Sequence, residues 1–142
     1  MRMRKATKED IDVVIDLWDK SGLPIRPKGR DAPENLIKQL NEPNLWILVA
    51  EESGEIVGVV LVTHDARKGW INRLAIKSSR TREGIATKLL QAAEKSLYEM
   101  GIEVIALLIK DDNLASRDFF EKENYQYSKE IAYYSKRLDP DS

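Results

Sequence analysis

The chain has 142 residues, enough for one compact domain that buries roughly 68–70% of the surface of its unfolded chain. Hydrophobic residues make up 42% and charged residues 33%, a composition typical of a soluble globular protein rather than a disordered or membrane-embedded one. Lys and Arg number 23 against 24 Asp and Glu, so the net charge of −1 argues against nucleic acid as a partner. With no Cys and one His, the chain excludes disulfides, a Cys nucleophile and a multi-His zinc site.

No apolar run reaches the roughly 20 residues that span a bilayer, and the opening residues contain no apolar export segment. We therefore expect a cytoplasmic protein with no membrane partner. The even composition predicts a single domain over residues 1–138, followed by a short frayed tail at 139–142.

The first third of the chain predicts a strand and two helices. Met1–Ala6 is a short strand, and Thr7–Asp10 is typical of the capping box that begins a helix. Apolar residues then recur at spacings of three and four, at Ile11, Val14, Ile15 and Trp18. This spacing predicts an amphipathic helix. Two prolines in Leu23–Arg30 prevent a regular helix there, and Pro33 suits the first turn of a second helix that ends at Leu40.

The middle of the chain predicts an antiparallel meander. Two apolar runs, Leu45–Ala50 and Ile56–Val62, flank a turn at Ser53–Glu55, and Gly69–Ile76 follows as a third strand. Three consecutive strands with short connections pair with their neighbours along the chain. We expect these strands to form the middle of the sheet.

The last third alternates helices and strands. Gly84 begins a long amphipathic helix and Gly101 ends it, and the unbroken apolar run Ile102–Ile109 predicts a strand buried on both faces. A helix over Asn113–Glu123 and two strands within Tyr125–Leu138 complete the chain. The whole order predicts an α+β fold in α/β/α layers, with about four helices around a mixed, mostly antiparallel sheet.

The turn between the third meander strand and the long helix has the composition of an anion-binding site. The first N–H groups of a helix lack partners and carry a partial positive charge. Gly84 and Ala86 leave the backbone approachable, Thr87 offers a hydroxyl, and Arg80 and Arg82 add positive charge. A tightly packed helix entry would use the same small residues, so this turn alone does not specify a ligand.

Two sequence blocks match known patterns. Thr81–Ala86, which follows the strand end Leu74–Ile76, matches the pattern Arg/Gln-x-x-Gly-x-Gly/Ala after a strand. Asn113–Tyr125 matches the pattern Asn-x-x-Ala/Ser-x-x-Phe/Leu-Tyr-x-x-x-Gly-Phe. With these two blocks the chain resembles the GNAT family of acetyl-CoA-dependent N-acetyltransferases. The order of elements also agrees over essentially the whole chain, so the resemblance implies the GNAT fold.

The resemblance implies a site for acetyl-CoA and no metal. It assigns the diphosphate to the turn around Thr81, Arg82, Gly84, Ile85, Ala86 and Thr87. It assigns the pantetheine arm to the main chain of Leu74 and Ile76, in a wedge between this strand and the next, with Asn113, Ser116, Phe119 and Phe120 on the opposite side. The backbone N–H of Leu74 would bind the oxyanion of the reaction.

Four positions depart from what is usual in the family. Thr81 replaces the usual Arg or Gln, for which Arg80 or Arg82 could compensate, and Asn124 replaces a Gly, which it can do in the left-handed conformation. Phe120 stands where many members have a Tyr that protonates the leaving thiolate. Trp70 stands where some members have a Glu base, which leaves the general base unassigned among His64, Asp65, Asp111, Asp112, Tyr133 and Tyr134. Asp111 and Asp112 are also typical of a helix N-cap.

Without a Cys nucleophile, direct attack of an amine on the thioester in a ternary complex is the simplest route. We therefore predict an acetyltransferase that acts on a primary amine of a small molecule, a peptide N-terminus or a lysine. The basic loop with Arg26, Lys28 and Arg30 suggests an anionic acceptor, although a solvated loop has the same composition. The alternative is a non-catalytic acyl-CoA-binding sensor or partner module. A homodimer is compatible with the resemblance, because dimerisation is common in this fold.

Overall fold

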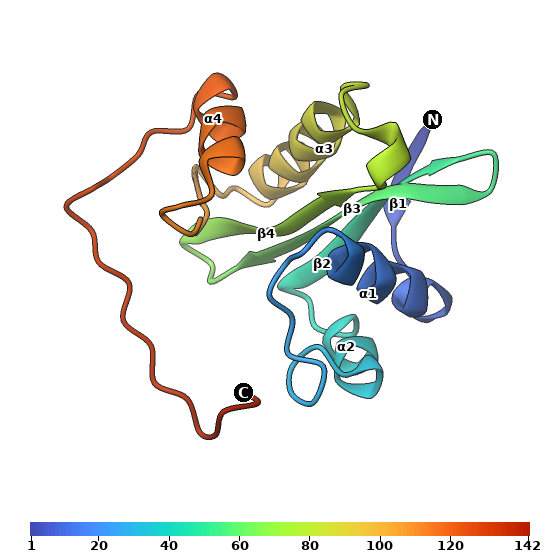
Figure 1. The fold of residues 1–142 in the computed structure, drawn as a ribbon, viewed down its shortest axis with the longest axis horizontal. Helices are drawn as coiled ribbons and strands as arrows, with labels where there is room; N and C mark the ends of the chain where they lie inside the picture. Colours follow the sequence, from blue (N-terminus) through green and yellow to red (C-terminus); the bar gives the residue numbers. More distant parts are fainter.

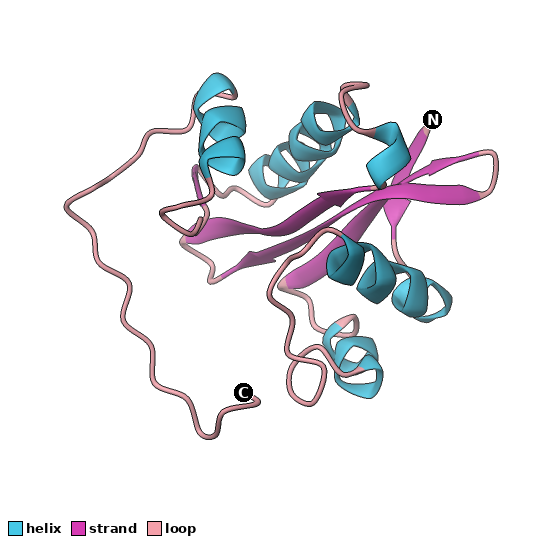
Figure 2. Ribbon diagram, viewed as in Figure 1, coloured by secondary structure: helices cyan, strands magenta, loops and turns pink.

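The computed structural model describes residues Met1–Ser142. Its centre is a five-stranded sheet in the order β1-β2-β3-β4-β5, antiparallel from β1 to β4, with β5 parallel to β4. Helices cover both faces of this sheet (Figures 1 and 2). The elements are β1 (Arg2–Lys5), α1 (Ile11–Lys20), α2 (Pro33–Gln39), β2 (Leu45–Glu52), β3 (Glu55–His64), β4 (Lys68–Ile76), α3 (Ile85–Glu99), β5 (Val104–Ala106) and α4 (Leu114–Lys122). This architecture confirms the predicted fold class and the three-strand meander.

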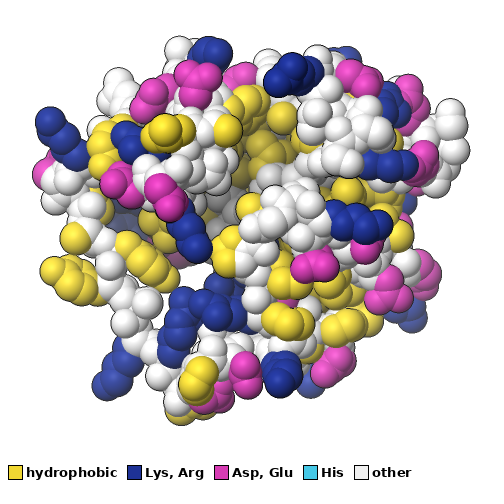
Figure 3. All heavy atoms as spheres, viewed as in Figure 1, with side chains coloured by type: hydrophobic (Ala, Val, Ile, Leu, Met, Phe, Trp, Pro, Cys, Tyr) yellow, Lys and Arg dark blue, Asp and Glu magenta, His cyan; other side chains and the backbone are white.

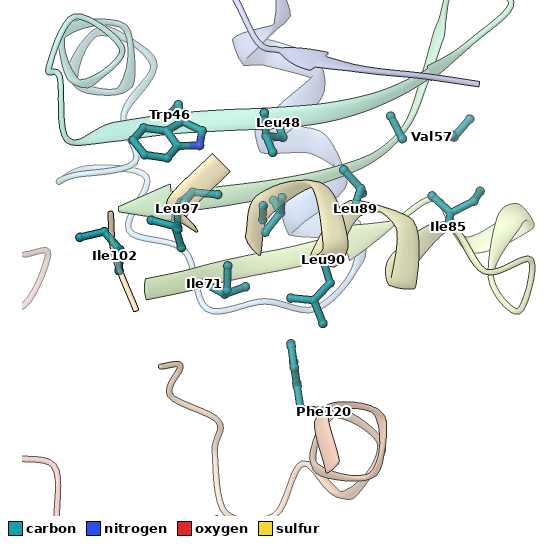
Figure 4. Close-up of a cluster of buried hydrophobic side chains, with 14 residues drawn as sticks. Trp46, Leu48, Val57, Ile71, Ile85, Leu89, Leu90, Leu97, Ile102 and Phe120 are labelled. Atoms are coloured by element: carbon teal, nitrogen blue, oxygen red, sulfur yellow. The ribbon is translucent and has the colours of Figure 1, made fainter. Parts of the chain in front are cut away.

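The sheet separates two hydrophobic clusters. Along β2, Trp46 and Leu48 pack into the cluster beneath α3, whereas Ile47 and Val49 pack into the cluster beneath α1 and α2. Successive side chains of a strand point to opposite faces, so a strand covered on both sides is apolar throughout. The α3 side is the larger cluster and includes Phe120 from α4 (Figure 4).

The predicted capping box is present at the start of α1. The carboxylate of Asp10 accepts the backbone N–H of Thr7 at 2.8 Å, and Arg4 donates to Asp10 at 2.7 Å and to Glu51 at 2.9 Å. The hydrogen bond from Arg4 is the main cause that lowers the pKa of Asp10 below its usual value. These ion pairs connect β1, the start of α1 and the end of β2.

The prediction for Ile102–Ile109 was wrong in its extent and its burial. The strand β5 spans only Val104–Ala106 and lies at the edge of the sheet. Val104 and Leu108 are exposed, whereas Ile105, Leu107 and Ile109 pack against the α3 cluster. The segment therefore has one buried face, because no element covers its outer side.

The two strands predicted within Tyr125–Leu138 are absent. The chain after α4 runs in an extended path without helix or strand, standing away from the sheet for much of its length (Figure 1). Its start is attached to the body, since the Tyr125 hydroxyl donates to Glu94 at 2.7 Å. Beyond that point Ile131, Tyr133 and Tyr134 are exposed. The edge of β5 that faces away from β4 therefore has no partner strand.

Candidate functional site

Strands β4 and β5 pair at one end and separate at the other. Their register covers only Lys68 with Val104, Gly69 with Ile105, and Trp70 with Ala106. Beyond Trp70, β4 continues to Ile76 with no strand on that side. Backbone groups on an open strand edge can hydrogen-bond an extended, amide-bearing ligand. The structure thus leaves an open wedge between β4 and β5 beyond Trp70.

A β-bulge lies in β4 at the mouth of this wedge. Val59 pairs with Ala75 and Leu61 pairs with Asn72, so Arg73 and Leu74 stand together opposite the single residue Val60. Arg73 adopts a left-handed conformation with φ of 49°. A bulge bends the strand and redirects the groups at the extra residue. Here the redirected peptide is the one that joins Arg73 to Leu74.

A groove of about 1000 Å³ runs past the open edge of β4. It brings together five of the predicted site residues, from β4, the following turn and the start of α4, namely Leu74, Ile76, Thr81, Asn113 and Ser116. The space-filling view shows the surface hollowed over β4, with hydrophobic atoms on its floor (Figure 3). The other wall of the groove comes from α1 and the β2–β3 turn.

A second cavity of about 380 Å³ lies at the N-terminus of α3. Its lining contains eight of the predicted residues, seven from the end of β4 to the start of α3 and one from α4, namely Ile76, Thr81, Arg82, Gly84, Ile85, Ala86, Thr87 and Phe119. Because Ile76 and Thr81 line both cavities, the two form adjoining parts of one surface. Its two ends correspond to the sections that the sequence assigned to pantetheine and diphosphate.

The backbone of the turn before α3 is shaped by two left-handed residues. Arg82 has φ of 67° and Gly84 has φ of 80°. Turns of this kind present successive N–H groups on one side, and the first turn of α3 adds its own unpaired N–H groups. A side chain built on Gly84 would meet nothing within 4 Å, so this face is open. The local geometry fits an anion.

The two arginines of the turn differ in their partners. Arg80 forms ion pairs with Glu52 and with Glu83, the latter at 3.0 Å. Arg82 is exposed and forms no ion pair. Of the two residues that could replace the missing family arginine at Thr81, Arg82 is therefore the one with a free guanidinium. The Thr87 hydroxyl donates to Glu123 at 2.7 Å, which places a carboxylate near this end of the site.

Helix α4 contributes residues to both cavities and to the core. Asn113 is its N-cap, with the side-chain oxygen accepting the Ser116 N–H at 3.2 Å, so the N-cap expected at Asp111 or Asp112 lies one or two residues later. Phe120 lines neither cavity. Its ring is buried and packs edge-on against Phe119 and Tyr125, with ring centres 5.0 and 5.4 Å apart. Asn124 adopts the left-handed conformation expected where the family has Gly.

None of the six candidate bases lines the groove. His64 pairs with Gly69 at the far end of β4, and its Nδ1 accepts the Ala66 N–H at 3.0 Å. Asp65 accepts two backbone N–H groups of the β3–β4 turn, chiefly that of Lys68, which lowers its pKa. The other four candidates, Asp111, Asp112, Tyr133 and Tyr134, are exposed on loops.

The carboxylates that do line the groove are all ion-paired. Asp10 and Glu51 bind Arg4, Asp16 binds Lys20, and Glu55 binds Lys77. The pKa of Glu55 is lowered, mainly by its hydrogen bond from Lys77. A carboxylate held ionised by a cation is a weak proton acceptor. Asp10 and Glu55, whose pKa values are lowered, are therefore poor candidates for a general base near neutral pH.

A buried polar network that the sequence does not indicate lies beside Leu74. Arg73 forms an ion pair with Asp31, which is only 3% exposed, and its backbone oxygen accepts the indole N–H of Trp18 at 2.9 Å. Trp18 was recognised as a core residue from its helical spacing. No local pattern distinguishes Asp31 from the solvated residues of its loop, since its partner lies 42 positions away.

The structure contains no group of three or more His, Asp or Glu side chains arranged to hold a metal ion. Its helices are also too short or too polar to cross a membrane.

Comparisons with known proteins agree with this geometry. The sequence profile of the "Acetyltransferase (GNAT) family" matches residues 12–125. Acetyltransferase SG1711 of Sodalis glossinidius is 32% identical over 142 residues, which cover 99% of this chain and 98% of that protein. Among solved structures, the acetyltransferase AAC(6')-Iy with a CoA-containing bisubstrate analog superposes with a TM-score of 0.80 at 16% identity, covering 96% of this chain and 98% of that one.

A predicted acetyltransferase from Clostridium acetobutylicum, solved with acetyl-CoA, has a TM-score of 0.76 at 20% identity, over 94% and 95% of the two chains. At these identities the structures show a shared fold, whereas the profile match and the relative at 32% show the family. The chain therefore belongs to the GNAT family of acetyltransferases.

Proposed function

We propose that the protein transfers the acetyl group of acetyl-CoA to a primary amine within a ternary complex. The observation that carries this proposal is the open edge of β4 beyond Trp70, which adjoins the anion-binding turn at the start of α3. Together they form one continuous surface with an extended section and a positive end. Acetyl-CoA has the matching shape, an amide-bearing arm that ends in a diphosphate.

In this proposal, the diphosphate binds the N–H groups between Arg82 and Thr87, and the arm lies along Leu74 and Ile76. The amide nitrogen of Asn113 makes no hydrogen bond within the chain, so it can donate to the arm from the other wall of the groove. Ser116 and Phe119 line the same side. Phe120 supports this wall from the core rather than forming its surface.

The chemistry needs an oxyanion donor more than a strong base. The amine nitrogen attacks the thioester carbonyl, a C–N bond forms, the C–S bond breaks, and the amine proton passes to solvent or to the departing thiolate. The Leu74 N–H at the bulge is our candidate oxyanion donor, a role worth about 3–4 kcal/mol in other enzymes. Since ion pairs engage the carboxylates that line the groove, the neutral fraction of the amine supplies the nucleophile in this proposal.

The test is release of CoA from acetyl-CoA against a panel of small amines and lysine-containing peptides. We expect thiol release that requires both acetyl-CoA and an amine, with acetylated amine formed in equal amount. Binding of acetyl-CoA without turnover over the whole panel would instead support the non-catalytic module. Absence of binding would contradict both.

We expect Arg82→Ala to weaken acetyl-CoA binding about tenfold, the effect of losing one charge-assisted contact to phosphate. The loss should shrink as salt is raised, because exposed charges are screened. Arg67→Ala removes an equal charge from the β3–β4 turn, outside both cavities, and should leave the affinity unchanged. Isothermal titration of both variants with acetyl-CoA at two salt concentrations measures the affinities and their salt dependence. Equal affinities for the two variants would exclude Arg82 from the site.

A further inference from the structure

Arg73 occupies a backbone conformation that an arginine adopts at a cost. Its φ of 49° lies in the left-handed region, which is unfavourable for residues other than glycine. It is also the residue directly before Leu74, at the bulge opposite Val60. Such a conformation persists only where the surrounding structure holds it.

The indole of Trp18 holds the backbone of Arg73. Its N–H donates to the Arg73 carbonyl oxygen at 2.9 Å, and the ring, fully buried, lies 5.2 Å from the guanidinium carbon of the same residue. The hydrogen bond crosses from α1 to β4. The carbonyl of Arg73 is therefore fixed toward the α1 side of the sheet.

This hydrogen bond also fixes the direction of the Leu74 amide. The Arg73 carbonyl and the Leu74 N–H belong to one planar trans peptide, in which the two groups point in opposite directions. A carbonyl directed at α1 sets the N–H facing away from α1. If the peptide rotated, the N–H of Leu74 would turn with it.

Asp31 holds the side chain of Arg73 and joins it to the loop between α1 and α2. One oxygen of Asp31 pairs with the guanidinium, and the other accepts the backbone N–H of Arg26 at 2.6 Å. With Asp31 at 3% exposure, this ion pair is shielded from water. The guanidinium therefore lies between the Asp31 carboxylate and the face of the Trp18 ring.

We propose that Trp18 and Asp31 are positioning residues that hold the Arg73–Leu74 peptide, and with it the Leu74 N–H, in the orientation that binds the oxyanion. The inference rests on the proposed function for the role of Leu74. In this proposal, the contacts of Asp31 with Arg73 and with the Arg26 backbone connect the loop between α1 and α2 to the peptide that binds the oxyanion.

The first test compares two buried tryptophans. Trp18→Phe removes the hydrogen bond to Arg73, and Trp46→Phe removes the bond that Trp46 donates to Ser96 at 3.0 Å on the other face of the sheet. We expect Trp18→Phe to lower kcat about 10- to 100-fold, the range for a displaced catalytic group, with acetyl-CoA affinity within about twofold. Trp46→Phe should lose similar thermal stability but keep its kcat. Equal kcat for both variants would overturn the proposal.

The second test asks whether the Arg73 side chain serves the backbone or the acceptor. In an Asp31→Asn background, which leaves no unpaired buried charge, Arg73→Gly and Arg73→Val remove the same guanidinium. Glycine adopts positive φ readily and valine does not, so we expect kcat of the glycine variant to exceed that of the valine variant at least ~5-fold. Equal kcat with a raised KM for the amine in both would assign Arg73 to acceptor binding and overturn the positioning role.

A ligand-free readout separates this inference from the proposed function. The amide resonance of Leu74 in a ¹⁵N–¹H spectrum should shift or broaden in Trp18→Phe and stay in place in Trp46→Phe. If the unsubstituted protein acetylates no amine, the proposed function fails, yet the spectrum still decides whether Trp18 orients this peptide. An unmoved Leu74 resonance in Trp18→Phe would overturn the inference even in an active enzyme.

Discussion

Gly84→Glu is expected to abolish detectable acetyl-CoA binding at concentrations that saturate the unsubstituted protein. The new carboxylate would stand at the open N-terminus of α3, where the diphosphate is proposed to bind. Two negative charges about 6 Å apart repel by about 2–3 kcal/mol at an effective dielectric constant near 20. This repulsion alone weakens binding by roughly 30- to 150-fold, before the lost approach to the backbone is counted.

The matched control is Gly101→Glu at the other end of α3. Gly84 and Gly101 have φ of 80° and 85°, and a side chain at either meets nothing within 4 Å. Both substitutions therefore carry the same left-handed strain, about 1–2 kcal/mol, and the same added charge. We expect saturating acetyl-CoA to raise the melting temperature of Gly101→Glu and to leave that of Gly84→Glu unchanged, as measured by thermal unfolding with and without the ligand. A ligand-induced rise in both variants would place the diphosphate elsewhere.

Leu89→Ala is expected to cause the largest loss of stability. Leu89 is fully buried in α3, where it packs against the sheet near Ile85 and Leu90 (Figure 4). Truncating a buried leucine costs about 2–5 kcal/mol, from lost burial and the remaining cavity. For a domain of this size, the melting temperature should fall by roughly 6–15 °C. Lys95→Ala, an exposed position on the same helix, should shift it little.

The acetyl-CoA affinity of Leu89→Ala, measured well below its melting temperature, separates packing from binding. We expect an affinity within about threefold of the unsubstituted protein, because backbone groups of the first turn make the proposed contacts and the Leu89 side chain is buried in the core and lines neither cavity. If Leu89→Ala is fully folded and yet binds acetyl-CoA much more weakly, the packing of α3 against the sheet sets the geometry of the anion-binding turn.

Much of the fold follows from local patterns in the chain. The 3.6-residue period of α1 and α3, the capping box at Thr7 and the left-handed Gly101 each depend on neighbouring residues, so the sequence alone indicates them. The apolar runs of β2 and β3 and the turn between them predict a hairpin for the same reason. The two family blocks also place the turn before α3 and the start of α4, which the structure brings to adjoining cavities.

The end of the chain shows where local patterns fail. An apolar run such as Ile102–Ile109 has the same composition whether a strand is central or at an edge, because the difference lies in what covers it. The structure leaves Val104 and Leu108 uncovered, and Tyr125–Leu138 forms no strand beside β5. Whether other elements pack over both faces of a strand is decided only when the layers assemble.

The sequence by itself determined the layered α+β fold, the family and the turn at which an anion can bind, since these depend on periodicity and on residues close together in the chain. Only the tertiary structure decided how β4 opens from β5, that Arg80 is paired while Arg82 is free, and that Phe120 is buried. It alone joined Arg73 to Trp18 and Asp31, 55 and 42 positions away. The bulge that these residues hold interrupts the two-residue alternation of a strand, and distant contacts of this kind leave no signal in the local sequence.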